Sequence, residues 1–275
     1  MTASVSELME RWNLTPDGVG VETPRARIFR VRRDGVSAIL KVASAVSDEV
    51  RAAATLRHFA GEGAVQILAE EPGALPLEGA EPGTPLTAMV AEGRDNDATA
   101  IIADTAISLH RFPPPEAFPT LEMWADGFRR QREREPHALL PPETIARAET
   151  AFREIARPAA GDRLLHADLH HDNILHDERR GWLAIDPKGI VGDPAYEIVS
   201  ALGNPNRLHP LAADPAVMRR RIAIFAERLA LDPQRITTWT AAHFVLAACW
   251  HVEDGNTDTD VANCLAIAET ARSLL

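Results

Sequence analysis

The chain has 275 residues, of which 45% are hydrophobic and 25% are charged, and its formal net charge at pH 7 is −11. This length suits roughly two domains or lobes, and the composition is ordinary for a soluble globular protein. Because phosphate backbones and anionic lipids are bound by clustered lysine and arginine, the acidic excess argues against nucleic acid and membrane surfaces as partners.

The cysteine content and the first residues indicate the expected compartment. Cys249 and Cys264 are too few for the disulfide framework of a secreted domain, and neither belongs to a C-x-x-C pair. Residues 1–5 lack the basic run and apolar stretch of a signal peptide. No window approaches the ~18 consecutive apolar residues of a membrane span. We therefore expect a cytoplasmic protein in a reducing compartment.

The first third of the chain is predicted to be rich in β-structure. Residues 26–32 alternate between apolar and polar side chains, and residues 36–42 form a second β-prone run. Asp34 and Gly35 stand between the two runs. An Asp-Gly pair in this position is a strong signal for a β-hairpin.

A helix is expected to follow the hairpin. Ser47 can cap its N-terminus, and Asp48 and Glu49 complement the helix dipole there. The helix is predicted to run to about residue 60. The residues at helical spacing that would form its inner face are Glu49, Ala52, Ala53, Leu56, Phe59 and Ala60.

A change of lobe is predicted after two further short strands, near residues 64–69 and 75–77. The next stretch, residues 78–85, is rich in glycine and proline and is typical of a connector. We therefore divide the chain into a small first lobe, residues 1–79, and a larger second lobe, residues 80–275.

The second lobe is predicted to be mainly helical. Asp95 or Asp97 can start its first helix. Further helices are expected at residues 120–134, 142–156, 194–202, 215–230, 233–252 and 258–274. Three short apolar runs interrupt this pattern, and we interpret them as small strands that hold a polar loop: residues 163–166, 173–176 and 182–185.

The polar loop carries the most informative motif of the chain. His166, Asp168 and Asn173 fit the pattern H-x-D-x-x-x-x-N, and Asp186 stands at the end of the next apolar run. Phosphoryl transfer needs such a set, because one carboxylate accepts the proton of the attacking hydroxyl. An asparagine and a second carboxylate then hold Mg²⁺ on the phosphates.

A lysine in the first lobe completes this pattern. Lys41 lies near the end of the second hairpin strand, in the run Ala38-Ile39-Leu40-Lys41, which is similar to the strand lysine motif of kinases. A strand lysine, a helix acid, the H-x-D-x-x-x-x-N loop and a later aspartate occur here in kinase order. Each element is weak alone, whereas the four in this order are specific.

Several phrases of the chain resemble the aminoglycoside phosphotransferase family of the kinase-like superfamily. Residues 184–189 read AIDPKG, and residues 192–197 read GDPAYE. Residues 81–86 (EPGTPL) and 250–255 (WHVEDG) add to the likeness. Together they look most like the streptomycin 6-phosphotransferase and hydroxyurea phosphotransferase branch, and the resemblance covers roughly residues 10–270.

The resemblance implies an α+β fold of the bilobal protein-kinase type, with a nucleotide-binding first lobe and a catalytic second lobe. It implies transfer of the γ-phosphoryl group of ATP to a hydroxyl of a small substrate, with ATP and Mg²⁺ as cofactors. By the family pattern, adenine binds at the connector near residues 78–80 (Glu78 and Ala80), and the remaining roles fall to four residues. Asp168 is the base, Asn173 and Asp186 hold Mg²⁺, and Lys41 binds phosphate.

The chain departs from the family pattern at three points, the first of which is a nucleotide loop near residues 23–27 without a G-x-G-x-x-G motif. Related sequences tend to carry a glutamate where this helix has Ala52, so Glu49, one turn earlier, is the candidate partner of Lys41. Gly189 stands where we expect proline. The gap between Asp186 and Pro194 leaves no room for an activation loop, which favours a small-molecule kinase over a protein kinase.

The acceptor is expected to be cationic and hydroxylated. Trp250 offers an aromatic face, and Glu253 and Asp254 offer two carboxylates at the end of the same predicted helix; Asp126 and Lys188 are further candidate contacts. Carboxylates and aromatic faces both favour guanidinium or ammonium groups. Streptomycin is the leading candidate, while hydroxyurea and a housekeeping metabolite stay open.

Two other functions are compatible with the motif. A transition-metal hydrolase could draw ligands from its side chains, which are His166, Asp168, His170, His171, Asp172 and His176. However, the rest of the sequence offers no second His-rich motif to complete such a site. A nucleotide-binding pseudokinase is the other alternative, and the intact motif argues against it.

Less specific roles are expected for three residues in and around the motif. His166 is predicted to pack and form hydrogen bonds beneath the loop rather than to take part in the chemistry. Asp193 is predicted to cap a helix that starts at Pro194, because aspartate before an N1 proline is a start signal. Tyr196 is expected to be structural.

Overall fold

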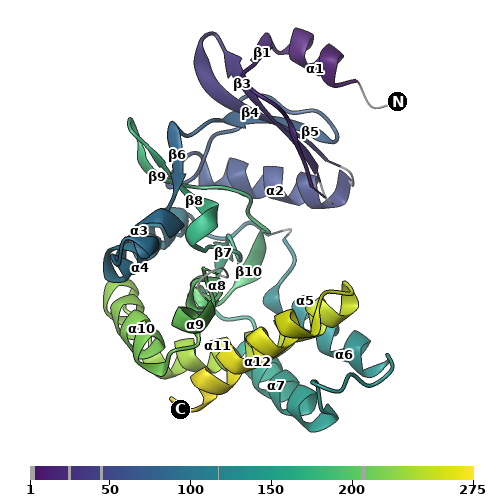
Figure 1. Cartoon of the computed structure of the whole chain (residues 1–275), viewed down its shortest axis with the longest axis vertical. Coiled ribbons are helices and arrows are strands. Elements are labelled where there is room, and N and C mark those ends of the chain that lie inside the picture. The colour runs from purple at the N-terminus through teal and green to yellow at the C-terminus, as the bar shows by residue number, and fades with distance from the viewer. Residues whose placement is uncertain (1–3, 24–25, 44–45, 117, 206–208) are drawn as a thin grey trace.

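The computed structural model describes residues 4–23, 26–43, 46–116, 118–205 and 209–275, with side chains described for all of these except residues 46–49 and 209. An antiparallel sheet with one long helix beneath it forms the first part of the molecule, and a larger, mainly helical part follows (Figure 1). This is the bilobal α+β arrangement predicted from the sequence.

The first part is built on a five-stranded antiparallel sheet in the order β1-β3-β4-β5, with β2 paired to β3. The predicted hairpin is confirmed, because β3 and β4 pair from Ala26 opposite Ala43 to Arg33 opposite Val36. Asp34 and Gly35 both have positive φ, as a tight hairpin turn requires. The elements are α1 (Val5–Arg11), β1 (Leu14–Pro16), β2 (Val21–Glu22), β3 (Ala26–Arg33), β4 (Val36–Ala43) and β5 (Ala74–Glu78).

Helix α2 (Val46–Phe59) runs beneath this sheet (Figure 1). Its predicted inner face is buried at Ala52, Ala53, Leu56 and Phe59. The prediction is wrong for Ala60, which is exposed and adopts a left-handed conformation that ends the helix. The helix also starts one residue before Ser47, which therefore lies inside its first turn and does not precede it.

The predicted strand at residues 64–69 is also wrong. This segment forms isolated bridges, from Ala64 to Ala184 and from Ile67 to Leu77, and no continuous ladder. The apolar run is instead used as packing, since Ala64 and Val65 are buried in the main core. A short apolar run does not by itself distinguish a strand from a buried connection.

Strand alternation places the predicted phosphate-binding lysine. Ala38, Leu40 and Val42 of β4 face a small core shared with α1 and β1. Because successive side chains of a strand point to opposite faces, Ile39 and Lys41 face the other side of the sheet. Ile39 there packs against the main core, which also contains Leu56 and Phe59 of α2 and continues into the helical part. The division at residues 79 and 80 stays a prediction.

Two small antiparallel sheets connect the two parts. The connector forms β6 (Pro82–Pro85), which pairs with β8 (Ile174–Asp177), and β8 pairs with β9 (Gly181–Ala184). Separately, β7 (Arg163–Leu165) pairs with β10 (Ile190–Gly192). The three predicted short strands are confirmed, whereas β6 and β10 were not predicted, because their glycine and proline residues obscure strand patterns.

The helical part contains the helices predicted at residues 142–156, 215–230, 233–252 and 258–274 and the one predicted to start at Asp95 or Asp97, whereas two predicted helices are divided. Residues 120–134 form two short helices in place of one, and residues 194–202 form a 3₁₀ turn (Pro194–Tyr196) followed by α8 (Val199–Leu202). The other helices are α3 (Thr87–Ala91), α4 (Asp95–Leu109), α5 (Leu121–Trp124), α6 (Asp126–Arg132), α7 (Pro142–Ile155), α9 (His209–Ala212), α10 (Pro215–Leu229), α11 (Pro233–Glu253) and α12 (Asp258–Arg272). Within the described ranges, none of the helices is both long and apolar enough to cross a bilayer.

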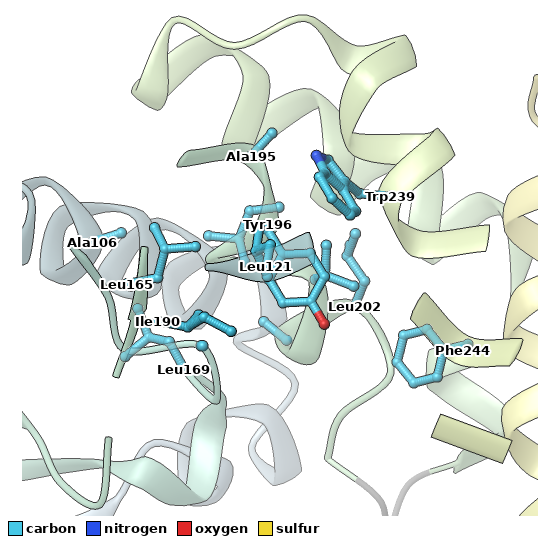
Figure 2. Packing of buried hydrophobic residues seen from close by; sticks show 14 of the residues in the cluster. Ala106, Leu121, Leu165, Leu169, Ile190, Ala195, Tyr196, Leu202, Trp239 and Phe244 are labelled. Carbon is cyan, nitrogen blue, oxygen red and sulfur yellow. The ribbon is translucent and has the colours of Figure 1, made fainter. Parts of the chain in front are cut away.

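Aromatic rings fill the centre of the helical part (Figure 2). The ring of Tyr196 meets that of Trp239 edge to face at 4.9 Å, and Phe152 meets Trp239 at 5.0 Å. Leu165 and Ile190, from the paired strands β7 and β10, pack nearby. Tyr196 is therefore a core residue, as predicted, and it ties the strands of the polar loop to α11.

Candidate active site

His166 fixes the start of the polar loop. Its side chain is fully buried, its Nε2 atom donates to the carbonyl of Ile185 at 2.8 Å, and its Nδ1 atom accepts from the backbone N–H of Asp168 at 3.3 Å. Burial lowers the pKa of His166 and keeps the ring neutral. The predicted supporting role is confirmed, because both ring nitrogens are engaged in holding the loop.

Glu197, to which the sequence assigned no role, supports the loop from below. Its carboxylate has no exposed surface and accepts from the backbone N–H groups of His166 and Ala167, each at 2.9 Å. His110 of α4 lies at 2.9 Å from the same carboxylate. Burial raises the pKa of Glu197, but the hydrogen bond and charge of His110 and the loop contacts outweigh it and lower the pKa overall. A charged group buried in this way rigidifies the backbone just before Asp168.

Asp168 directly follows the backbone that Glu197 holds, and its side chain is partly exposed. Ser200 of α8 donates to its Oδ1 atom at 3.1 Å, and Lys188 lies 3.5 Å from its Oδ2 atom. Nε2 of His170 is 3.7 Å from Oδ1. The side-chain amide of Asn173 donates to the backbone carbonyl of Asp168 at 2.9 Å, which leaves the amide oxygen of Asn173 as its ligand atom for a cation.

Asp186 is held between two lysines from different parts of the molecule. Lys41 of β4 lies 2.6 Å from its Oδ1 atom, and Lys188 lies 3.3 Å from its Oδ2 atom. Burial raises the pKa of Asp186, but Lys188 and Lys41 outweigh this and lower it to about 2. Asp186 also has a φ of 57°, a conformation that costs a non-glycine residue energy and that concentrates at functional sites.

Helix α2 contacts the loop that follows Asp186. Arg51 donates to the carbonyl of Lys188 at 2.8 Å. Gly189 has a φ of 69°, and a Cβ atom there would overlap the hydroxyl of Thr55. The proline expected at this position is therefore excluded, because proline fixes φ near −65°. Glu49 lies in the first turn of α2, but its side chain is outside the described residues, so its pairing with Lys41 stays a prediction.

The adenine-binding role expected for the connector at Glu78 and Ala80 stays a prediction. The carboxylate of Glu78 accepts from the backbone N–H of Gln66 at 3.1 Å and forms an ion pair with Arg180 from the turn between β8 and β9. Gly79 lies so close to β4 that a Cβ atom would overlap Ser37. With the Glu78 side chain engaged, adenine contacts at Glu78 and Ala80 would have to come from the main chain.

The donor set suits Mg²⁺ better than a transition metal. Asn173 and Asp186 offer oxygen atoms, and Mg²⁺ is usually held by one or two protein carboxylates together with water and phosphates. Among the residues that the structure describes, no three His, Cys, Asp or Glu side chains are grouped to hold a metal ion. His166 is engaged on both nitrogens, and the ring of His176 packs on Trp182 at 5.0 Å. The geometry therefore does not support the hydrolase alternative.

The predicted acceptor residues lie where α6 meets the end of α11. Trp250 packs edge to face on Trp124 at 5.4 Å, and Glu253 forms a two-point ion pair with Arg130 of α6, at 2.9 and 3.1 Å. Asp126, half exposed at the start of α6, lies 3.7 Å from Arg153. Asp254 is exposed at the end of α11. The structure thus groups Trp250 and Glu253 with α6, but Glu253 is not the unpaired carboxylate that the sequence suggested.

Sequence comparison relates this chain to a known protein family. The profile of a family described as aminoglycoside/hydroxyurea antibiotic resistance kinase matches residues 11–255. The chain belongs to this family. It is 35% identical to the streptomycin 3''-kinase of Klebsiella pneumoniae, over 97% of this chain and 100% of that protein. It is 33% identical to the streptomycin 6-kinase of Streptomyces griseus, over 94% and 85% of the two chains.

A further relative is the hydroxyurea phosphotransferase of Kitasatospora aureofaciens, 33% identical over 91% of this chain and 73% of that protein. Among solved structures, an aminoglycoside phosphotransferase in complex with ADP and hygromycin B superposes with a TM-score of 0.70 at 19% identity, covering 98% of this chain and 99% of that chain. The choline kinase LicA of Streptococcus pneumoniae gives 0.67 at 12% identity, over 98% and 97% of the chains. These structural similarities confirm the kinase-like fold.

Membership of the family settles the reaction class. The chain is an ATP-dependent small-molecule kinase, a phosphotransferase that acts on a hydroxyl group. The resemblance identified from residues 81–86, 184–189, 192–197 and 250–255 is confirmed. The individual roles of the site residues and the cytoplasmic location stay predictions.

Proposed function

We propose that this kinase phosphorylates streptomycin or a closely related cationic aminoglycoside. The observation that carries the proposal is the line of alternating charges formed by Lys41, Asp186, Lys188 and Asp168, with 2.6, 3.3 and 3.5 Å between successive partners. Such a line would suit phosphate binding by the two ammonium groups next to a carboxylate that acts as base. Two relatives, matched over 100% and 85% of their own length, act on streptomycin according to their names.

We assign one role to each of these residues and to Asn173. Asp168 accepts the proton of the attacking hydroxyl, because its carboxylate lies beside Lys188 at the end of this line of charges. Lys41 binds the α- and β-phosphates, and Lys188 contacts the transferred phosphoryl group, since it already bridges Asp168 and Asp186. Asn173 and Asp186 would hold Mg²⁺, which neutralises phosphate charge when it is bound.

The electrostatic environment of Asp186 is consistent with this assignment. A carboxylate whose pKa is lowered to about 2 is fully ionised at neutral pH and available to a divalent cation. The two lysines that lower the pKa are the groups that would turn to phosphate oxygens when nucleotide binds. Only 15% of the Lys41 side chain is exposed, so its ammonium group is confined to this position.

The acceptor is proposed to bind beside α5, α6 and the end of α11. Trp124 and Trp250 form an edge-to-face pair there, and both rings are half-buried. A ring contact from Trp250 to His243 at 6.0 Å and from His243 to Tyr196 at 5.3 Å links this region to the core beneath the catalytic loop. Asp126 and Asp254 supply exposed carboxylates for a cationic acceptor.

The experiment is a direct comparison of acceptors. Purified enzyme with Mg-ATP is assayed for ADP release and for product mass with streptomycin, hygromycin B, hydroxyurea and a neutral disaccharide. We expect the highest kcat/KM with streptomycin, and the position of the new phosphate, read by NMR, distinguishes a 3''- from a 6-kinase. A higher kcat/KM with hydroxyurea or the neutral sugar would overturn the proposed acceptor.

A further inference from the structure

The carboxylate of Asp168 has a hydrogen-bond partner outside the kinase motifs. The hydroxyl of Ser200, in the short helix α8, donates to Oδ1 of Asp168 at 3.1 Å. Lys188 lies near the other oxygen, so the two contacts together fix the plane of the carboxylate. We propose that Ser200 is a positioning residue for Asp168 and that a buried network from Asn204 and Arg221 holds Ser200 in place. The inference rests on the proposed role of Asp168 as the base.

The hydroxyl of Ser200 donates to a side chain, whereas several other helix hydroxyls of this molecule donate to backbone carbonyls. Serine and threonine inside helices commonly donate to the carbonyl four residues earlier. Thr99, Thr105 and Thr240 do so here, each at 2.8 Å. Ser200 is the second residue of α8, so the residue four positions earlier lies outside its helix, and its hydroxyl donates to Asp168, which is 32 residues away in the sequence.

Helix α8 is too short to hold Ser200 by itself. It spans four residues, and isolated helices shorter than about 12–15 residues are marginal in water. Asn204 compensates directly, because its side-chain amide donates to the backbone carbonyl of Ser200 at 2.9 Å. This hydrogen bond fixes the backbone from which the Ser200 hydroxyl reaches Asp168.

Arg221 of α10 anchors the same segment from inside the protein. Its side chain is 1% exposed, and its Nη1 atom donates to the carbonyls of Ala201 at 3.0 Å and Asn204 at 2.7 Å. Its charge is balanced by Asp95 of α4, with Nη2 2.6 Å from Oδ1 of that carboxylate. A buried charge needs such partners, and removing one of them typically destabilises the fold strongly.

The network therefore connects α4 and α10 to the catalytic carboxylate through α8. Every step is a hydrogen bond. Arg221 donates to Asp95 and to the carbonyl of Asn204, Asn204 donates to the carbonyl of Ser200, and Ser200 donates to Asp168. A base that is displaced by about 1 Å can lose on the order of 100-fold in rate, so the network acts on turnover more than on binding.

The first experiment removes and restores the hydroxyl. Ser200→Ala is expected to lower kcat about 10- to 100-fold while the KM values for ATP and the acceptor stay near those of the wild type. Ser200→Thr keeps a hydroxyl and is expected to recover most of the rate. Ser108→Ala is the matched control, because the hydroxyl of Ser108 donates to the carbonyl of Asp104 within α4. This control is expected to keep the wild-type kcat.

The second experiment tests the network. Asn204→Ala is expected to lower kcat by itself and to add little in the Ser200→Ala background, because both changes interrupt one path. Since replacing Arg221 alone leaves the buried Asp95 carboxylate with only the half-exposed Arg220 as its ion-pair partner, the double change Arg221→Leu with Asp95→Leu is used, and it is expected to lower kcat in folded protein. Fully multiplicative losses of kcat for Ser200→Ala and Asn204→Ala would overturn the network.

The results separate this inference from the proposed function. Wild-type kcat in Ser200→Ala, together with a large loss in Asp168→Ala, overturns the positioning role alone. A loss in Ser200→Ala that Ser200→Thr does not recover, with equal changes in both KM values, identifies a structural serine and also overturns it. Wild-type kcat in a folded Asp168→Ala variant overturns the proposed base and this inference with it.

Discussion

The proposed catalytic centre and the proposed acceptor region of this kinase are built in opposite ways. At the catalytic centre, charged side chains from distant segments meet directly, as Lys41 of β4 and Asp186 do at 2.6 Å. At the acceptor region, by contrast, rings pack edge to face and Glu253 is paired with Arg130 on the protein itself. The first region is fixed by long-range ion pairs and buried hydrogen bonds, and the second by apolar contacts and half-exposed charges.

This difference separates chemistry from specificity. Glu197 and His166 beneath the catalytic loop are fully buried, so a change there disturbs the backbone that carries Asp168. Asp254 and Asp126 are exposed or half exposed, so they can be replaced without unfolding their helices. A family whose members act on streptomycin and on hydroxyurea by name would need this combination of a constant reaction centre and an adjustable acceptor surface.

The largest effect is expected from Asp168→Ala. Loss of a positioned general base typically lowers the rate about 10²- to 10⁴-fold, and the loss should be the same for every acceptor because the base belongs to the constant region. The measurement is kcat with saturating Mg-ATP and acceptor. Asp172→Ala is the control in the same loop, since the Asp172 carboxylate accepts from Thr87 at 2.6 Å, and it should keep most of the rate. Equal losses in the two variants would contradict the assignment.

A smaller effect, confined to the nucleotide side, is expected from Asp186→Asn. The substitution removes one negative charge between Lys41 and Lys188, so Mg²⁺-dependent binding of ATP should weaken by roughly tenfold or more. Calorimetric titration with ATP at several Mg²⁺ concentrations measures this, and acceptor binding serves as the internal control. Chelation of Mg²⁺ should abolish turnover of the wild type. Unchanged ATP affinity at limiting Mg²⁺ would show that Asp186 is not a metal ligand.

The acceptor side is tested by charge reversal. Asp126→Lys with Asp254→Lys, at the two exposed carboxylates, should raise the KM for a cationic acceptor about tenfold and leave the KM for ATP unchanged. The matched control is Glu10→Lys with Glu227→Lys, which changes the net charge equally at two exposed positions away from α11. If both double variants raise the acceptor KM equally, general charge is responsible and the local site is misplaced.

The smallest effect concerns the pH dependence of stability. Burial, together with the charge of Arg221, lowers the pKa of His171 beneath the loop to about 3, and neither ring nitrogen has a hydrogen-bond partner among the described residues. Below pH 6.5, His171 therefore binds a proton in the unfolded chain but not in the folded protein. The stability contributed by neutral His171 is present above pH 6.5 and is lost progressively as the pH falls towards 3.

Urea unfolding at several pH values between 6.5 and 5 measures this proton. Replacing His171 with Leu should reduce the slope of unfolding free energy against pH by up to about 1.4 kcal/mol per pH unit, which is one proton. Glu197 and Asp186 have lowered pKa values and act below this window. The slope between pH 7.5 and 8.5 is the internal control and should not change. Identical slopes for the two proteins below pH 6.5 would show that His171 is already solvated.

Much of the reaction centre was predictable from the sequence because its key spacing is local. His166, Asp168 and Asn173 lie within one loop, and the hydrogen bond from the Asn173 amide to the Asp168 carbonyl spans only five residues. The hairpin was equally predictable, since the Asp34-Gly35 turn fixes the register that places Lys41 on the inner face of β4. Local errors occurred where a signal was ambiguous, as at Ala60 and at residues 64–69.

Hydrophobic period and turn residues thus predicted the two lobes, because they are properties of neighbouring residues. Short motifs carried the resemblance to the family and indicated the chemical groups of the proposed centre. Only the tertiary structure decided which groups support them. Glu197 reaches the loop across 31 residues, Arg221 reaches Asp95 across 126, and Arg130 neutralises Glu253 across 123. No spacing rule predicts such pairs, since they form only when separate helices pack and burial forces each charge to find a partner.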